Sequence, residues 1–327
     1  MIHSLIFDDQ GKFIGRDASL DQLRTFLAEN HKLIWVDLES ATQEEAHHIL
    51  GEDLFNFHPL AINDCHEAIS TPKIEPYEGV EPWRPCTFVV LHGMEYSAEE
   101  ETVRTPELDA FIGKNFLVTW HEQPMKAIAQ AFDRCVKTGP RGTDRLLHTI
   151  VDFLVESYQP AVDALAGQIA ALQDQVFSQP TQATLNHIQA IRRQVTLFRQ
   201  TVAPQREVIG RLARGEFKMI RAHLLPYFRD VHDALVRIGY TTDAYTDHLT
   251  NTLQVYLSHS ANQTNEVVKV LTILNAISLP PLVIASIYGM NLKIPEFQWA
   301  YGYLWAWGLM LGTTFGLLIW LKRKNWF

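Results

Sequence analysis

The sequence is poor in cysteine: its 327 residues include only Cys65, Cys86 and Cys135. None of them forms a Cys-x-x-Cys pair, so no disulfide framework is expected. A Gly-rich phosphate loop, a nucleophile elbow and a His-Glu-x-x-His motif are also missing, and we therefore do not expect an enzyme. The first residues alternate like a strand and carry acids early instead of forming a secretory signal. We expect the N-terminal part to fold in the cytoplasm.

Positive charge is also scarce over most of the chain. The net charge is −9, but residues from Ala261 onward carry five basic and two acidic residues, or +3. The first 260 residues then hold 23 basic and 35 acidic residues, or −12. An acidic soluble part argues against a nucleic-acid partner and is compatible with cations. Ordinary soluble-domain acidity explains the charge equally well.

Residues 1–140 have the pattern of a cytosolic α/β domain. Short β-type runs occupy residues 2–7, 32–38, 87–93, 108–113 and 115–121. Helical stretches at residues 42–50 and 57–69 lie between them.

Strand signals stop after this domain, and the pattern becomes helical. Residues 141–218 predict a cytosolic helical hairpin, with one helix over 145–177, a Ser-Gln-Pro-Thr break at 178–181 and a second helix over 182–214. A third pattern starts near Met219, with an interruption expected at Pro226. It has no clear stop, which predicts a stalk helix over 219–269 that continues into a membrane.

Two stretches without charge, residues 270–290 and 302–321, are each long enough to cross a bilayer as a helix. The basic residues 322–324 follow the second stretch and predict a cytosolic tail over 322–327. With two spans the N-terminal domain lies on the same side. Residues 291–301 would then be the extracytoplasmic loop of a protein of the inner (plasma) membrane.

A single hairpin of spans cannot enclose a water-filled path, so it is either an anchor or one of several copies around an axis. Steps of three and four along the first span define one helix face that includes polar groups. Its residues are Asn265, Val268, Leu271, Asn275, Leu279, Leu282 and Ser286. This face either lines a pore or joins helices through polar contacts. Pro280 and Pro281 lack an N–H, so two backbone carbonyls one turn earlier lose their helical hydrogen bonds and need other partners or water.

Several motifs, in order, resemble the CorA-type magnesium channel family. They are YFRDVHD (227–233), VYLS (255–258), NQTNEVVKVLT (262–272), IYGMN (287–291), Pro295-Glu296 and KRKNW (322–326), with weaker matches in HPLAINDCHEA (58–68) and TPKIE (71–75). The resemblance covers nearly the whole chain. Gly-Met-Asn is specific here because it ends the first of two C-terminal spans.

The resemblance implies a homopentameric funnel whose first spans line the pore and whose second spans form an outer ring. Gly289, Met290 and Asn291 would form the selectivity filter, with Gly289 allowing the backbone turn and Asn291 forming a ring at the mouth. Neutral carbonyl oxygens suit Mg²⁺, which sheds water reluctantly. Glu296 in the loop would attract cations, or it is an ordinary exposed acid.

The resemblance also implies gating by Mg²⁺ bound between neighbouring cytosolic domains. Asp64 and Asp230 occupy the corresponding motif positions, and carboxylates suit a weakly held, hydrated divalent cation. Asn63 stands where a second acid is expected. By this resemblance Mg²⁺ would be both the transported and the regulatory ion, and no organic cofactor is expected.

Three residues depart from the family pattern, namely Asn275, Pro281 and Leu282. They leave a Zn²⁺, Co²⁺ or Ni²⁺ transporter of the same architecture as an alternative. Met290 favours Mg²⁺, because the zinc-transporting branch tends to carry Gly-Val-Asn. A non-conducting, membrane-anchored metal sensor is a further alternative. Residues 64–67 with His58 could also be read as a zinc site.

Overall fold

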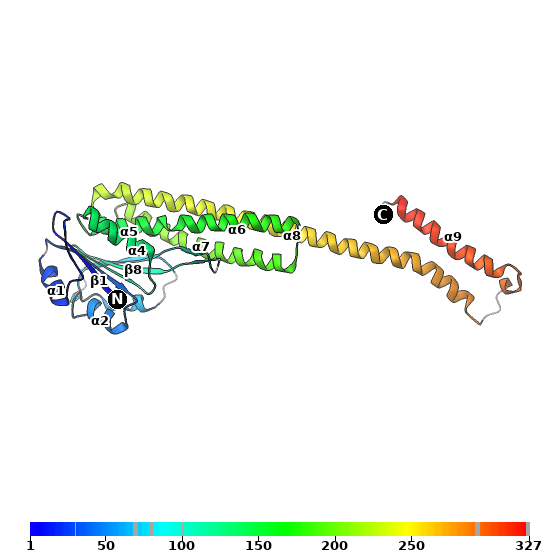
Figure 1. Cartoon of the computed structure of the whole chain (residues 1–327), viewed down its shortest axis with the longest axis horizontal. Helices are drawn as coiled ribbons and strands as arrows, with labels where there is room; N and C mark the ends of the chain where they lie inside the picture. Colours follow the sequence, from blue (N-terminus) through cyan, green and yellow to red (C-terminus); the bar gives the residue numbers. More distant parts are fainter. Residues whose placement is uncertain are drawn as a thin grey trace. The chain divides into compact units, whose positions relative to one another are not determined.

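The computed structural model describes residues 1–29, 31–67, 71–78, 81–99, 101–178, 180–291 and 295–324. The chain divides into two compact units, Met1–Thr252 and Leu253–Phe327, and its course is drawn in Figure 1. The first unit contains the sheet, and the second contains the two apolar helical segments. Each unit is considered by itself.

A seven-stranded mixed sheet forms the centre of the first unit, in the order β2-β1-β3-β9-β8-β5-β4. Its β3–β9 pair is parallel and its other pairs are antiparallel. A separate hairpin joins β6 and β7. The strands are β1 Ile2–Phe7, β2 Phe13–Arg16, β3 Leu33–Glu39, β4 Lys73–Tyr77, β5 Cys86–His92, β6 Glu95–Ser97, β7 Thr102–Arg104, β8 Glu107–Ile112 and β9 Phe116–His121.

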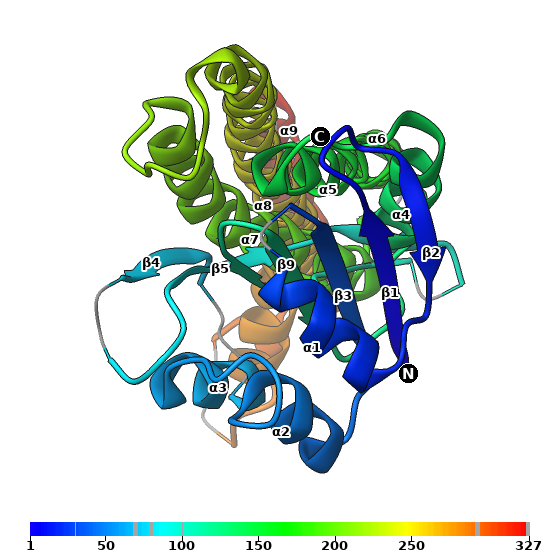
Figure 2. The ribbon, with the colours of Figure 1, turned by 90° about the vertical axis from the view of Figure 1, so that its left-hand side faces the viewer.

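Helices cover both faces of this sheet (Figure 2). One face carries α1 Leu20–Ala28, α2 Gln43–Leu50 and α3 Pro59–His66. The other carries α4 Lys126–Thr138, α5 Thr143–Glu156, α6 Tyr158–Ser178 and α7 Gln182–Ala213. The remaining elements are η1 Ala222–Leu224, α8 Leu225–Tyr288, η2 Pro295–Gln298 and α9 Gly302–Arg323.

The central strands are buried on both faces, which explains why their sequences are almost continuously apolar. Every residue of β5 and of β9 is buried. Between the sheet and α1–α3, phenylalanine rings stack closely, with the Phe57 and Phe111 centroids 4.4 Å apart. The five runs expected to be strands correspond to β1, β3, β5, β8 and β9, so this prediction is confirmed.

The prediction of one long helix over residues 145–177 is wrong, because the structure has two helices in this stretch. Helix α5 ends at Glu156, α6 begins at Tyr158, and Ser157 lies between them. The Ser157 hydroxyl donates a hydrogen bond of 2.6 Å to the Leu154 carbonyl, which satisfies part of this helix end.

The expected interruption at Pro226 is also wrong. Pro226 lies in the first turn of α8, where a proline costs no hydrogen bond. Helix α8 begins at Leu225, six residues later than the predicted start near Met219.

A glutamine side chain fastens α7 to the sheet. The Gln205 side chain is fully buried, accepts a hydrogen bond from the His92 backbone N–H (2.9 Å) and donates one to the His92 carbonyl (3.1 Å). The Tyr158 hydroxyl donates to the same carbonyl at 2.5 Å. The end of β5 is thus held by both α6 and α7.

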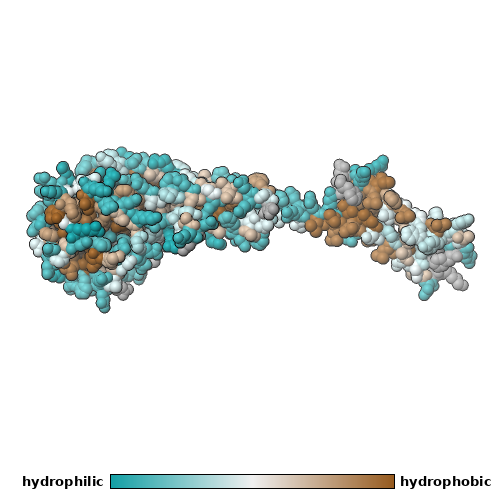
Figure 3. Space-filling model, viewed as in Figure 1, coloured by the Kyte–Doolittle hydropathy of each residue, from teal (hydrophilic) through white to brown (hydrophobic). Residues whose placement is uncertain are grey.

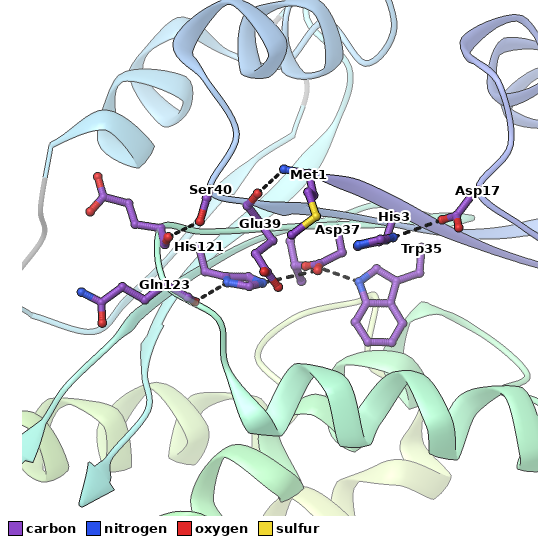
Figure 4. Close-up of polar contacts among 11 residues, drawn as sticks. Met1, His3, Asp17, Trp35, Asp37, Glu39, Ser40, His121 and Gln123 are labelled. Carbon is purple, nitrogen blue, oxygen red and sulfur yellow. Dashed lines mark hydrogen bonds and ion pairs between the residues drawn. The ribbon is translucent and has the colours of Figure 1, made fainter. Parts of the chain in front are cut away.

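A buried polar network spans the parallel β3–β9 pair (Figure 4). His121 Nδ1 lies 2.6 Å from the Gln123 carbonyl, and Nε2 lies 3.3 Å from Asp37 Oδ2. The Gln123 carbonyl and an ionised Asp37 carboxylate are acceptors, so this geometry suits the protonated ring, in which both nitrogens donate. Burial alone would lower the pKa of His121, but Asp37, through its hydrogen bond and charge, and the Gln123 carbonyl outweigh burial and raise it.

We expect His121→Gln to destabilise the chain by about 3 kcal/mol at about pH 6, because it breaks a buried ion pair. The pKa of His121 is raised in the folded state, so its contribution is complete below the unfolded pKa and is lost as pH rises through the folded pKa. The difference in unfolding free energy between parent and variant should therefore shrink as the pH rises above about 6.5. Denaturant unfolding monitored by circular dichroism checks this, with exposed His31→Gln as control. If the variant's loss of unfolding free energy instead grew with pH, the prediction would be contradicted.

Candidate transport path and cation sites

Two helices carry apolar stretches long enough to cross a membrane, by length and composition: the C-terminal part of α8 and α9. Figure 3 shows hydrophobic residues gathered over the C-terminal part of α8 and over part of α9. Within the chain these side chains are largely uncovered, and Leu282, for example, is 69% exposed. Such a surface requires lipid or protein partners.

The seven residues predicted to line a pore all lie on α8 and are all exposed. At 3.6 residues per turn they occupy an arc of about 120° of the helix surface. The less exposed residues Ile273, Ile277 and Ile284 lie on the opposite side. Within the described residues, the side chains of Asn265 and Asn275 make no hydrogen bond, so their amides are open to water or to another copy of the chain.

The Gly-Met-Asn residues follow directly on the end of α8. The Gly289 N–H donates to the Ala285 carbonyl at 2.9 Å, so the helical pattern of hydrogen bonds extends one residue past Tyr288. Gly289 has no positive φ but forms the turn that follows α8, and its role in allowing that turn stays a prediction. A Cβ there would instead approach the Ala285 carbonyl oxygen to 3.1 Å. Met290 and Asn291 are exposed at the end of this segment.

The loop acid lies in η2, where Glu296 is partly exposed in the first turn. The Glu296 carbonyl accepts a hydrogen bond of 3.1 Å from the Trp299 N–H. The described part of the loop is therefore a short ordered turn, and Lys293, which the sequence also places here, lies outside the described residues.

Asp64 on α3 already has a cationic partner. The Lys73 ammonium lies 2.6 Å from Asp64 Oδ2 and 3.3 Å from Glu75 Oε2. Burial alone would lower the pKa of Lys73, but the hydrogen bond and charge of Asp64, together with Glu75, raise it. A metal ion at Asp64 would compete with this lysine. Lys73 stands in the TPKIE stretch, but its pairing depends on the contact of α3 with β4.

Asp230 lines a groove of about 580 Å³ between α5, α6 and α8. Three further acids line it, namely Asp152, Glu156 and Asp163. Burial and the negative charge of Asp152 raise the pKa of Glu156, although Arg134 opposes them. These three acids come close to Asp230 only because α5, α6 and α8 pack together, so the spacing of residues along the sequence does not reveal them. With one base, Arg237, against four acids in its lining, the groove favours cations.

Asp64 and Asp230 do not meet within one chain. Helix α3 and the N-terminal part of α8 lie on opposite faces of the sheet (Figure 2). Among the described residues, no group of three or more His, Cys, Asp or Glu side chains is placed to hold a metal ion. A bridge between these two acids would need two chains.

The residues of the alternative zinc site point to different partners. The Cys65 thiol is buried and lies 3.4 Å from the Ala61 carbonyl, to which it donates. His58 Nδ1 accepts the Leu60 N–H at 3.2 Å and so caps α3. His66 packs edge-on against Trp120. The structure therefore does not support this zinc site.

An α/β unit of this topology, followed by two C-terminal apolar helices, fits a two-span membrane protein with a large N-terminal domain. Residues 30–323 match the family model described as CorA-like Mg²⁺ transporter protein, and the chain belongs to this family. It is accordingly a membrane transporter of Mg²⁺ or another divalent cation.

Individual relatives agree with this assignment. The cobalt/magnesium transport protein CorA of Thermotoga maritima is 29% identical over 301 residues, which cover 89% of this chain and 83% of the relative. The complete structure of the CorA magnesium transporter from Methanocaldococcus jannaschii has a TM-score of 0.76 at 19% identity and covers 99% of this chain and 98% of that one. The ZntB cytoplasmic domain from Vibrio parahaemolyticus has a TM-score of 0.55 at 17% identity and covers 71% of this chain and 88% of that one.

Proposed function

We propose that five copies of the chain form a homopentameric channel that passes hydrated Mg²⁺ through a pore lined by α8. One observation carries this proposal: the uncovered face from Asn265 to Ser286 leads directly into Gly289, Met290 and Asn291. An anchor needs neither a polar stripe nor exposed amides at its end. Neutral amide oxygens at Asn291 would hold the ion through its water shell.

The proposed topology places both termini in the cytoplasm of a cell whose inner (plasma) membrane holds the channel. The α/β domain (1–140), the helices within residues 141–218, the stalk part of α8 (225–269) and the basic tail (322–327) would be cytosolic. The spans would be residues 270–290 and 302–321, with residues 291–301 outside, where Glu296 would concentrate cations. The basic residues 322–324 support this orientation.

Flux into liposomes tests the channel and its ion together. Purified protein should pass Mg²⁺ down its gradient, while Zn²⁺, Co²⁺ and Ni²⁺ are measured in parallel. Faster entry of one of these three would assign the chain to the alternative transporter of the same architecture. No flux of any ion would favour the membrane-anchored sensor. Native mass spectrometry should count five subunits.

Regulation by cytosolic Mg²⁺ is the second part of the proposal. Asp64 of one subunit and Asp230 of its neighbour would share a hydrated ion, since no single chain brings them together. The acids Asp152, Glu156 and Asp163 beside Asp230 support a cation at this surface. When the ion leaves, their mutual repulsion would loosen the contact between subunits.

We expect Asp230→Ala to raise the internal Mg²⁺ concentration that half-inhibits flux by about tenfold, because one direct charge partner of the ion is lost. Liposomes loaded with graded Mg²⁺ measure this shift. Asp247→Ala removes an exposed acid from the same helix and should leave inhibition unchanged. Equal behaviour of the two variants would remove Asp230 from the gating site.

A further inference from the structure

A second cavity, of about 340 Å³, lies in the first unit and differs in charge from the acidic groove. The C-terminal end of α4, the N-terminal half of α5 and the segment entering α8 form its walls. Its basic lining residues are Arg134, Arg141, Arg145, His148, Arg221 and His223. We call it the arginine cavity. Of its lining residues, the proposed function uses only Asp152.

The arginine cavity carries an excess of positive charge within an acidic protein. Its four arginines are offset by the lining residue Asp152 and by Asp144, the ion-pair partner of Arg221, which leaves an excess of two. The whole chain has a net charge of −9. Cations gathered in one hollow repel one another, and an anion in the hollow relieves that repulsion.

Three of the arginines are held in place and keep donors free. Arg221 donates through Nε and a terminal nitrogen to Asp144, at 2.7 and 2.6 Å. The Arg145 guanidinium lies 4.9 Å from the centroid of the Tyr227 ring. Arg141 donates only Nε to the Gln10 carbonyl, at 3.1 Å. A guanidinium has five N–H donors, so each retains some for a ligand.

Arg134 completes the set from the exposed side of α4. A fork of guanidinium donors matches the oxygens of a phosphate group in pairs, and neighbouring arginines can share one polyphosphate. The cavity volume falls within the range of about 300–1,000 Å³ typical of small-ligand sites. The aromatic ring of Tyr227 and the Phe153 side chain add apolar surface to the lining.

We propose that the arginine cavity binds a polyphosphate anion, free or as part of a nucleoside polyphosphate. The site would place that anion against the first turn of α8 through Tyr227. Asp152 lines both the arginine cavity and the acidic groove, so the two sites are adjacent. The proposal concerns binding alone and does not depend on the channel.

Calorimetry on the purified full chain in Mg²⁺-free buffer tests it with inorganic phosphate, pyrophosphate and adenosine triphosphate as probes. We expect pyrophosphate to bind more tightly than phosphate. The double variant Arg134→Gln/Arg145→Gln should weaken binding by about tenfold or more, because two charge-assisted contacts are lost. Tighter binding of the nucleotide than of pyrophosphate identifies the nucleotide as the source of the polyphosphate.

The matched control is Arg192→Gln/Arg193→Gln, which removes two exposed arginines from α7 and should bind like the parent. Arg134→Gln alone removes an exposed side chain and gives a partial loss, should the double variant not fold. Failure of all three probes to bind the parent, or equal weakening in variant and control, would overturn the proposal. Transport assays do not enter this test, so its failure is distinct from failure of the channel.

Discussion

Replacing Asn291 by alanine should reduce Mg²⁺ flux into liposomes by at least about 100-fold. In the proposed pentamer this substitution removes five amide groups from one ring. Each amide would make a hydrogen bond to water bound by a doubly charged ion, and contacts to charged groups contribute about 1.5–3 kcal/mol each. The ring would then no longer offset the hydration that the ion gives up on entering.

The control for this variant is Gln298→Ala. It removes an exposed amide from η2, in the same loop but outside Gly289–Asn291, and should leave flux near the parent value. Size-exclusion chromatography of both variants shows whether assembly is intact. Parent-like flux through Asn291→Ala would remove this residue from the filter.

Val268→Lys should also stop cation flux, by about 100-fold or more. Val268 is exposed on the predicted pore face of α8, beside the native Lys269. Five copies would place five ammonium groups around the path of the ion. At about 8 Å, each would repel a divalent cation by about 4 kcal/mol for an effective dielectric constant of about 20.

Val270→Lys provides the matched control, because it makes the same change two residues away. Two residues rotate the side chain by about 200°, so position 270 leaves the pore face. Val270 is as exposed as Val268, at 57% against 54%. Flux should persist in this variant. Equal loss in both variants would contradict the assignment of the pore face.

The strands and apolar helices could be predicted because their residues report directly on burial. Runs such as residues 87–93 and 115–121 are apolar on both faces, as in β5 and β9. Short edge and hairpin strands escaped prediction because β2, β6 and β7 bury little. The break at Ser157 also escaped, because apolar residues continue at helical spacing on both sides of it.

Some of the candidate sites could likewise be predicted from the sequence, and others could not. The face from Asn265 to Ser286 belongs to one helix, so sequence spacing suffices to find it. The pairing of Asp64 with Lys73 joins α3 to β4, and the acidic groove joins three helices. The arginine cavity likewise gathers residues from α4, α5 and the approach to α8. Sites of this kind form only when separate helices and strands pack together, and the spacing of residues along the chain does not reveal that packing.

The three cysteines are buried, and this has a practical consequence for labelling chemistry. Burial raises the pKa of the Cys86 and Cys135 thiols to about 12, and burial together with the charge of Asp109 raises the pKa of the Cys65 thiol well above its usual value. Alkylating reagents attack the thiolate, so the folded native chain should remain unlabelled near neutral pH. A single cysteine introduced along α8 would then report its own accessibility, and no native residue would first have to be replaced.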